Sequence, residues 1–341
     1  MIYQNILFHN VGDLMPVAGR EGLLLQRLPR EAEAQVRPGT AEKCRTPANV
    51  ELRFVPQGEV TISLMCYEDD LQCAIYAGDY QLEEYRFQQG PIELSIPNRE
   101  RLLELGERAE RRRFAPQVIR VVFFARFSKL HFLSVHGSLR PPRREELPEK
   151  CYLAYGTSIT QGYNACSPML TYAAQAAWRM GWDLLNLGVG GQGFCEEAMA
   201  RHIAQRGDWD VFSACISVNM LNLGVSAEEF RNTAARFFAI LAESNPGKPL
   251  YAISVLPFFA DQGVQGGAVP VSTPEEYRNA LWEVCQENPQ CKFIDGTQLL
   301  SFCNLTGDLI HPGTLGMIEI GERLAKIFAQ EECRFVKQIG Q

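Results

Sequence analysis

The sequence changes its pattern near residue 140, and this change most constrains the fold. Before it, short runs rich in β-branched and aromatic residues recur between Gly, Pro and Asp turns. After it, apolar runs typical of buried parallel strands alternate with amphipathic helical patterns. Residues 140–148, RPPRREELP, stand between the two patterns and indicate a stiff polar linker. We therefore predict an N-terminal domain at residues 1–140, a linker at 141–149 and a C-terminal domain at 150–341.

The N-terminal pattern predicts an all-β domain. Short strands at near-regular spacing favour a sandwich or a barrel. A short helix is expected within residues 99–113, where Leu and charged residues replace the β-rich pattern. The expected strands cover residues 50–55, 60–66, 72–76, 92–96, 118–124 and 130–135.

The C-terminal pattern predicts a parallel sheet between two layers of helices, because βαβ units form right-handed crossovers. The expected strands cover residues 151–155, 183–187, 211–217, 250–256 and 292–294. N-cap residues and prolines mark the starts of helices. These helices are expected to begin at Ser167, Ser226 and Thr273, and the last helix to cover residues 315–330.

Composition narrows the class of protein. The 33 Lys and Arg against 40 Asp and Glu give a net charge of −7, which argues against a nucleic-acid partner. No apolar run approaches the about 18 residues of a membrane span, and residues 1–5 lack the features of a signal peptide. The 11 cysteines follow no framework spacing, so we expect reduced thiols in a cytoplasmic protein, although Cys285 and Cys291 could pair. The five scattered histidines predict no metal, and we expect no cofactor.

A candidate nucleophile stands at the end of the first C-terminal strand. Ser158 follows an apolar run and a glycine turn, and ligands bind at this edge of parallel sheets. The same residue types are also common in plain turns, so a turn without a catalytic role is the alternative. A nucleophilic serine needs a base and an orienting acid. His311, with Asp308 three residues earlier, is the best candidate pair; the alternative is an exposed histidine in a loop that Asp308 merely caps.

Candidate oxyanion donors follow two other strands. Residues 186–193, NLGVGGQG, let a backbone N–H approach a ligand without a Cβ in the way, and Gly191 is the donor we expect. Asn219 follows the third strand, and its side-chain amide can donate to a developing oxyanion. Taken singly, each is also compatible with a plain turn.

In chain order, these residues resemble the SGNH (GDSL-type) hydrolase family. Residues 156–159, GTSI, stand where that family has Gly-Asp-Ser-Leu. Gly191, Asn219 and the Asp308–His311 pair match its later blocks, over residues 151–330. Two departures are Thr157 in place of the usual aspartate and residues 217–220, SVNM, in place of Gly-x-Asn-Asp.

The resemblance implies a three-layer αβα, flavodoxin-like hydrolase domain with a five-stranded parallel sheet. It extends more loosely to two-domain members with an N-terminal β-sandwich, among them carbohydrate esterases and some acyltransferases. We therefore expect the N-terminal domain to be a jelly-roll-like sandwich.

The activity that the resemblance implies is cleavage of carboxylic esters. Ser158 forms the acyl intermediate, His311 is the base and Asp308 the orienting acid, and Ser158, Gly191 and Asn219 form the oxyanion hole. We expect a small-molecule or carbohydrate substrate with a short acyl group, and no nucleic-acid or membrane partner. An acyltransferase with the same triad, or a carbohydrate-binding protein with an inactive hydrolase domain, stays open. Candidate substrate contacts, each also compatible with ordinary packing, are Gln192, Phe194, Met220, Phe258 and Phe259.

Overall fold

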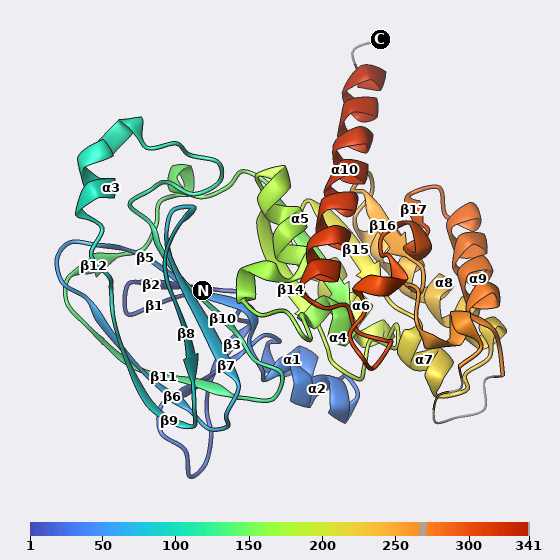
Figure 1. Cartoon of the computed structure of the whole chain (residues 1–341), viewed down its shortest axis with the longest axis horizontal. Helices are drawn as coiled ribbons and strands as arrows, with labels where there is room; N and C mark the ends of the chain where they lie inside the picture. Colours follow the sequence, from blue (N-terminus) through green and yellow to red (C-terminus); the bar gives the residue numbers. More distant parts are fainter. Residues whose placement is uncertain (265, 267–270, 340–341) are drawn as a thin grey trace. The chain divides into compact units, whose positions relative to one another are not determined.

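The structure is a computed structural model that describes residues 1–264, 266 and 271–339 (Figure 1). The chain divides into two compact units. Unit 1 comprises Met1–Glu149 and Ser167–Met169, and unit 2 comprises Lys150–Cys166 and Leu170–Gln341. The residues predicted as a linker, 141–149, thus belong to unit 1.

Unit 1 consists of two antiparallel sheets, as a β-sandwich requires. One sheet has the strand order β1-β2-β5-β10-β7-β8, with β12 paired to β5, and the other has the order β3-β4-β11-β6-β9. The strands are β1 (Ile2–Tyr3), β2 (Ile6–His9), β3 (Asp13–Pro16), β4 (Leu23–Gln26), β5 (Ala48–Pro56), β6 (Thr61–Cys66), β7 (Leu71–Ala77), β8 (Tyr80–Phe87), β9 (Gly90–Ser95), β10 (Ile119–Phe124), β11 (Leu130–His136) and β12 (Leu139–Arg140). Its helices are α1 (Arg30–Glu33), α2 (Pro38–Cys44) and α3 (Glu100–Leu105).

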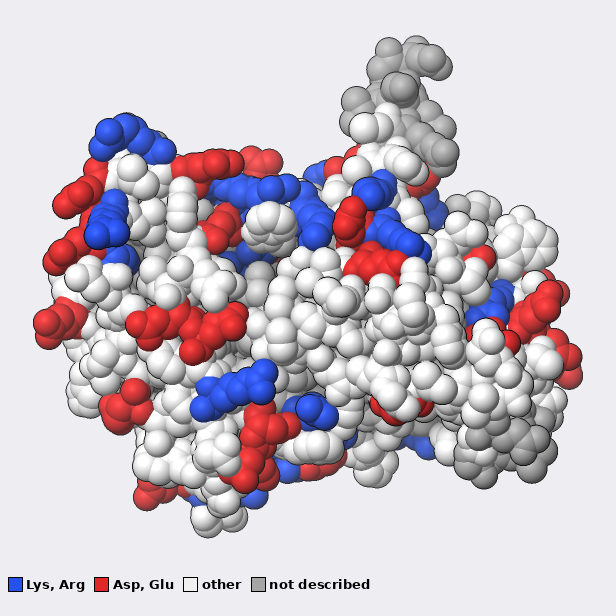
Figure 2. Space-filling model, viewed as in Figure 1, with Lys and Arg blue, Asp and Glu red and all other residues white. Residues whose placement is uncertain are grey.

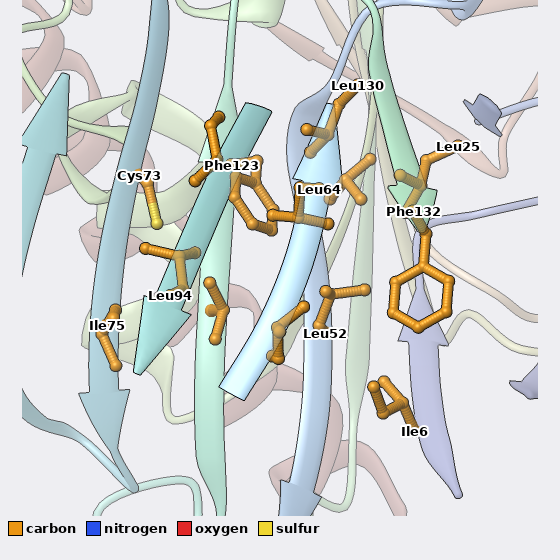
Figure 3. Packing of buried hydrophobic residues seen from close by; sticks show 14 of the residues in the cluster. Ile6, Leu25, Leu52, Leu64, Cys73, Ile75, Leu94, Phe123, Leu130 and Phe132 are labelled. Atoms are coloured by element: carbon orange, nitrogen blue, oxygen red, sulfur yellow. The ribbon is translucent and has the colours of Figure 1, made fainter. Parts of the chain in front are cut away.

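The core of unit 1 lies between the two sheets. Alternate residues of each strand point inward, so apolar side chains from both sheets meet (Figure 3). One sheet contributes Ile6, Leu52, Cys73, Ile75 and Phe123, and the other contributes Leu25, Leu64, Leu94, Leu130 and Phe132. The prediction of an N-terminal β-sandwich is confirmed, together with all six strands expected from the sequence.

A charged cluster is buried on the other face of one of these sheets. Glu51 and Arg53 alternate with the inward-facing residues of β5, and Arg120 lies beside them on β10. Glu51 accepts hydrogen bonds from Arg53 Nε at 2.7 Å and from Arg120 Nη2 at 2.6 Å. Burial opposes ionisation of Glu51, but the two arginines outweigh it and hold its pKa well below its usual range. The guanidinium of Arg120 also lies 4.0 Å from the centre of the Phe114 ring.

Unit 2 is a three-layer αβα domain around a parallel sheet, as predicted. Its strand order is β14-β13-β15-β16-β17, which is the flavodoxin-like order 2-1-3-4-5 in domain numbering. The strands are β13 (Cys151–Gly156), β14 (Asp183–Gly188), β15 (Val211–Cys215), β16 (Leu250–Ile253) and β17 (Cys291–Ile294). The helices are α4 (Ser158–Gln161), α5 (Tyr172–Met180), α6 (Glu197–Gln205), α7 (Val218–Asn222), α8 (Ala227–Ser244), α9 (Pro274–Glu287) and α10 (Thr314–Ile339).

Residues of β13 that point to opposite faces show how the helices cover the sheet. The Tyr152 ring packs edge-on against Phe328 of α10, while the Tyr155 ring stacks on Phe237 of α8. Helix α10 packs beside α5, and α8 packs against α6 and α9 (Figure 1). The two helical layers therefore bury the strands from both sides, which explains their nearly continuous apolar sequences.

Four predicted boundaries in unit 2 are corrected. Helix α5 begins after Thr171, whose side chain caps the Ala174 N–H, because Ser167 donates instead to Glu84 at 2.6 Å. The third and fourth strands end at Cys215 and Ile253, earlier than predicted. The last helix continues to Ile339, beyond the predicted end at residue 330.

Candidate active site

Ser158 lies at the carboxyl end of β13 and begins the short helix α4. Gly156 lets the chain turn here, because a Cβ at this position would lie 2.2 Å from Thr160 Oγ1 and 2.4 Å from the Cys215 carbonyl oxygen. Thr157 is the N-cap of α4, and its hydroxyl oxygen accepts from the Ile159 N–H at 3.4 Å. Thr157 thus supplies a cap at the position where the family usually has aspartate.

His311 reaches Ser158 from the loop before α10. Its Nε2 lies 2.8 Å from Ser158 Oγ, and its Nδ1 lies 2.7 Å from Asp308 Oδ2. A carboxylate can only accept, so Nδ1 carries the ring proton of neutral His311 and Nε2 can accept from the serine hydroxyl. The structure therefore brings together the three residues that the sequence predicted, in the order serine, histidine, aspartate.

The carboxylate of Asp308 is held ionised by its own loop. Partial burial opposes its ionisation, but the N–H groups of His311 and Ile310, the His311 ring and the Thr306 hydroxyl together lower its pKa to about 2. Both N–H groups donate to Oδ1 at 2.9 Å, which leaves Oδ2 for the ring. Asp308 is therefore an anion at neutral pH, with Oδ2 placed to accept from the imidazole.

The glycine loop after β14 is fixed by two side chains. Asn186 accepts from the Gly188 N–H and donates to the Thr160 carbonyl, each at 2.8 Å. Gln161 accepts from the Gly190 N–H at 2.8 Å. Gly191 follows with φ +70°, the region that favours glycine. Within the described part of the chain, neither the Ser158 N–H nor the Gly191 N–H has an acceptor, so both can donate to a ligand.

Asn219 lies in the first turn of α7, directly after the third strand. Ser217, with φ +96°, turns the chain from β15 into α7. The side-chain amide of Asn219 donates to the Gln192 carbonyl oxygen at 2.6 Å. This bond joins the two segments that the sequence predicted to carry oxyanion donors. It uses one of the two N–H groups of the Asn219 amide, and among the described residues the other has no acceptor.

The five predicted substrate contacts differ in accessibility. Gln192 is half-buried, whereas Phe194 and Met220 are buried. Phe258 and Phe259 are also mostly buried, yet both line a pocket of about 390 Å³ together with Leu221 of α7. The Phe259 N–H donates to the Leu309 carbonyl oxygen at 2.8 Å. Phe259 is thereby tied to the loop that carries Asp308 and His311.

Sequence reasoning missed three side chains that support the site. Gln161 holds the glycine loop, Thr306 donates to Asp308 Oδ1 at 2.9 Å, and Tyr163 stacks on the His311 ring. Tyr163 stands five residues after Ser158, but its sequence position did not predict which way its ring points. The contacts of Gln161 and Tyr163 join segments far apart in the sequence, whereas Thr306 and Asp308 belong to the same loop.

Four further features bear on function in the part of the chain that the structure describes. Among residues 1–264, 266 and 271–339, no three His, Cys, Asp or Glu side chains are grouped as metal ligands. Over the same residues, no helix is long and apolar enough to cross a membrane. Cys285 and Cys291 are free thiols with their sulfur atoms 3.3 Å apart. Acidic and basic side chains are interspersed on the face that Figure 2 shows.

Comparison with known proteins finds a family match that lies almost entirely within unit 2. Residues 154–317 match the GDSL-like lipase/acylhydrolase family. The chain therefore carries a GDSL-like hydrolase domain, and the resemblance drawn from the sequence is confirmed. A comparison with curated proteins gives no significant match.

Solved structures share the two-unit fold at low sequence identity. The salicylyl-acyltransferase SsfX3 from a tetracycline biosynthetic pathway has a TM-score of 0.76 and 17% identity, over 96% of this chain and 95% of that chain. A putative GDSL-like lipase from Bacteroides ovatus has a TM-score of 0.67 and 18% identity, over 98% and 96%. A family two carbohydrate esterase from Clostridium thermocellum, in complex with cellohexaose, has a TM-score of 0.58 and 14% identity, over 84% and 93%.

Proposed function

We propose that the protein is a serine esterase that cleaves short acyl esters, with Ser158 as nucleophile. The observation that carries this proposal is the unbroken chain of contacts from Ser158 Oγ to His311 Nε2 at 2.8 Å and from His311 Nδ1 to Asp308 at 2.7 Å. A nucleophile, its base and an orienting acid at these distances are what acyl transfer through serine needs.

In the proposed mechanism, the Oγ of Ser158 bonds to the ester carbonyl carbon while its proton moves to His311 Nε2. The electron pair of the carbonyl bond moves onto its oxygen, where the N–H groups of Ser158 and Gly191 stabilise it. The side-chain amide of Asn219 carries two N–H groups, and the one that is not bonded to the Gln192 carbonyl is the third donor that we propose. His311 then protonates the leaving alcohol, and water releases the acid from Ser158 by the same steps.

A carbohydrate ester is the substrate class that we propose first. The carbohydrate esterase from Clostridium thermocellum, which shares the fold, binds cellohexaose, and the fold alone carries this analogy. Phe258 and Phe259 are the side chains that we propose to contact the acyl group, because both line a pocket and the Phe259 N–H donates to the carbonyl oxygen of Leu309, two residues before His311.

An acyltransferase is the second candidate, favoured by the likeness to SsfX3 over nearly the whole chain. It would use the same acyl-Ser158 intermediate and pass the acyl group to an alcohol instead of water. Product partition separates the two activities. If added sugar or aromatic alcohols divert most of the acyl group from hydrolysis, the protein is a transferase.

The decisive test of the proposed function is Ser158→Ala, assayed with p-nitrophenyl acetate and then with acetylated sugars. We expect kcat to fall by about 10⁶, because the members of a triad act as a unit. Ser95→Ala, which changes a serine of β9 in unit 1, is the matched control and should keep the wild-type rate. Hydrolysis by Ser158→Ala at the wild-type rate would reject the assignment.

A further inference from the structure

The ring of Tyr163 lies against the imidazole of His311. The two ring centres are 5.0 Å apart, and the planes differ by 27°, so the rings are stacked. Tyr163 is half-buried, which separates it from the apolar core of unit 2. A Cβ on Gly190 would lie 3.6 Å from Tyr163 Cε2, so the same ring also borders the glycine loop.

The backbone fixes Tyr163 relative to Ser158. Gly162 ends α4 with φ +112°, and the Tyr163 N–H then donates to the Ser158 carbonyl oxygen at 3.0 Å. Only glycine adopts such a φ without strain. The nucleophile and the ring that stacks on its base therefore belong to one short, closed turn.

The next residue ties this turn to the loop of the acid. The Asn164 amide donates to Thr306 Oγ1 at 3.3 Å, and Thr306 Oγ1 donates to Asp308 Oδ1 at 2.9 Å. The Thr306 N–H also donates to the His311 carbonyl oxygen at 2.8 Å. Tyr163 thus stands where the serine turn and the histidine loop are joined side by side.

We propose that Tyr163 is a positioning residue that holds His311 in line with Ser158 and stabilises the imidazolium formed during catalysis. This role rests on the proposed function, in which the proton of Ser158 Oγ moves to His311 Nε2. The imidazolium then donates from Nδ1 to the Asp308 carboxylate. The face of the same ring lies against the face of the Tyr163 ring, where the π electrons carry partial negative charge. Because a cation is attracted to an aromatic face, the stack favours the transition state over the resting enzyme.

The test compares Tyr163→Leu with Tyr163→Phe. Leucine keeps an apolar side chain beside the imidazole but has no π face, whereas phenylalanine keeps the face and removes only the hydroxyl. We expect Tyr163→Leu to lower kcat by about 2- to 30-fold with little change in KM. Tyr163→Phe should recover most of this loss. The rate at which a fluorophosphonate labels Ser158 should fall and recover in parallel.

Thermal unfolding shows whether each variant is folded, and Tyr163→Met, which also lacks a π face, replaces the leucine variant if that one is not. Equal kcat and labelling rates in the wild type and Tyr163→Leu would overturn the inference. Equal losses in the leucine and phenylalanine variants would also overturn it, because the hydroxyl would then matter instead of the ring. A wild-type protein that is not labelled at Ser158 would overturn the proposed function itself, and this role with it.

Discussion

The two units bury polar side chains in different places. In unit 1, Glu51, Arg53 and Arg120 lie buried in the middle of a sheet, where the carboxylate pairs with both guanidinium groups. In unit 2, the strands are apolar along most of their length, and Ser158 and His311 stand beyond the strand ends. Removing one partner from a buried ion pair destabilises the fold, whereas polar groups at a sheet edge are available to a ligand. The comparison predicts that substitutions in unit 1 change stability and substitutions at the edge of unit 2 change rate.

The largest effect on stability is expected for Glu51→Gln. This change leaves Arg53 and Arg120 buried without their carboxylate, and breaking such a pair costs about 3–5 kcal/mol in the free energy of unfolding. Urea unfolding followed by intrinsic fluorescence measures the loss, while esterase activity below the transition should stay near that of the wild type. Glu42→Gln, which removes a half-exposed partner of Lys129, is the control and should cost less than about 1 kcal/mol. Equal losses in both variants would contradict the structural role of the cluster.

Asn219→Ala should lower the catalytic rate strongly and the stability only slightly. Loss of one oxyanion donor lowers kcat by about 10²–10³, equivalent to about 2.7–4 kcal/mol of transition-state stabilisation. The fold loses only the hydrogen bond to the Gln192 carbonyl, so the free energy of unfolding should change by about 1 kcal/mol. Steady-state kinetics and thermal unfolding on the same preparation separate the two effects. Leu223→Ala, an exposed residue at the end of α7, should change neither.

If Asn219→Ala instead lowered stability strongly and left kcat unchanged, its amide would serve only to join the two loops. The difference between the two units would then not extend to this residue.

The smallest effect, and the one that depends most on pH, is expected for Glu146→Gln in unit 1. The side-chain hydrogen bonds of Arg140 outweigh burial and, with the Arg143 N–H and Gln117, lower the pKa of Glu146 to about 2. A depressed carboxylate pKa stabilises the fold above the unfolded-state value near 4.5, and this contribution disappears as the pH falls towards 2. We expect a loss of about 1–3 kcal/mol at pH 7, which shrinks below pH 4.5. Urea unfolding at several pH values measures it.

The neighbouring Glu145 is exposed, so Glu145→Gln is the matched control. Its free energy of unfolding should stay close to that of the wild type at both pH 7 and pH 3. A Glu146→Gln loss that stays constant from pH 7 to pH 3 would mean that shape, and not charge, sets the contribution of this residue.

The sequence predicted most of unit 2 because its strands are buried on both faces and therefore stand out as apolar runs. The strands β1 to β4 escaped prediction because each is at most four residues long. Strand β8 escaped it because none of its side chains is buried and three of them, Glu83, Glu84 and Arg86, are charged. Ser167 was wrongly predicted as a helix cap, since its partner Glu84 lies far away in the sequence. Local patterns do not contain such partners.

In the candidate site, too, contacts between residues far apart in the sequence could not be predicted. Ser158, Asp308 and His311 were predicted to act together because their residue types and order are informative, and the distances between them fit that prediction. The stack of Tyr163 and the bridge from Asn164 to Thr306 depend on how two loops meet. Thr157 caps the N-terminus of α4 through its hydroxyl oxygen, a role that the sequence alone did not predict.

The segment Ser167–Met169 has a consequence for how the protein can be divided. Asn49 donates to the Pro168 carbonyl oxygen at 2.7 Å and Glu84 accepts from Ser167, so three residues from within the hydrolase sequence belong to unit 1. The chain consequently passes from one unit to the other three times, not once. A fragment that starts at residue 150 would keep this segment and lose its partners, with Tyr163 only four residues away. In terms of modularity, the boundary between the units does not coincide with a single point in the chain, so a cut at residue 150 does not divide the sequence into the two units.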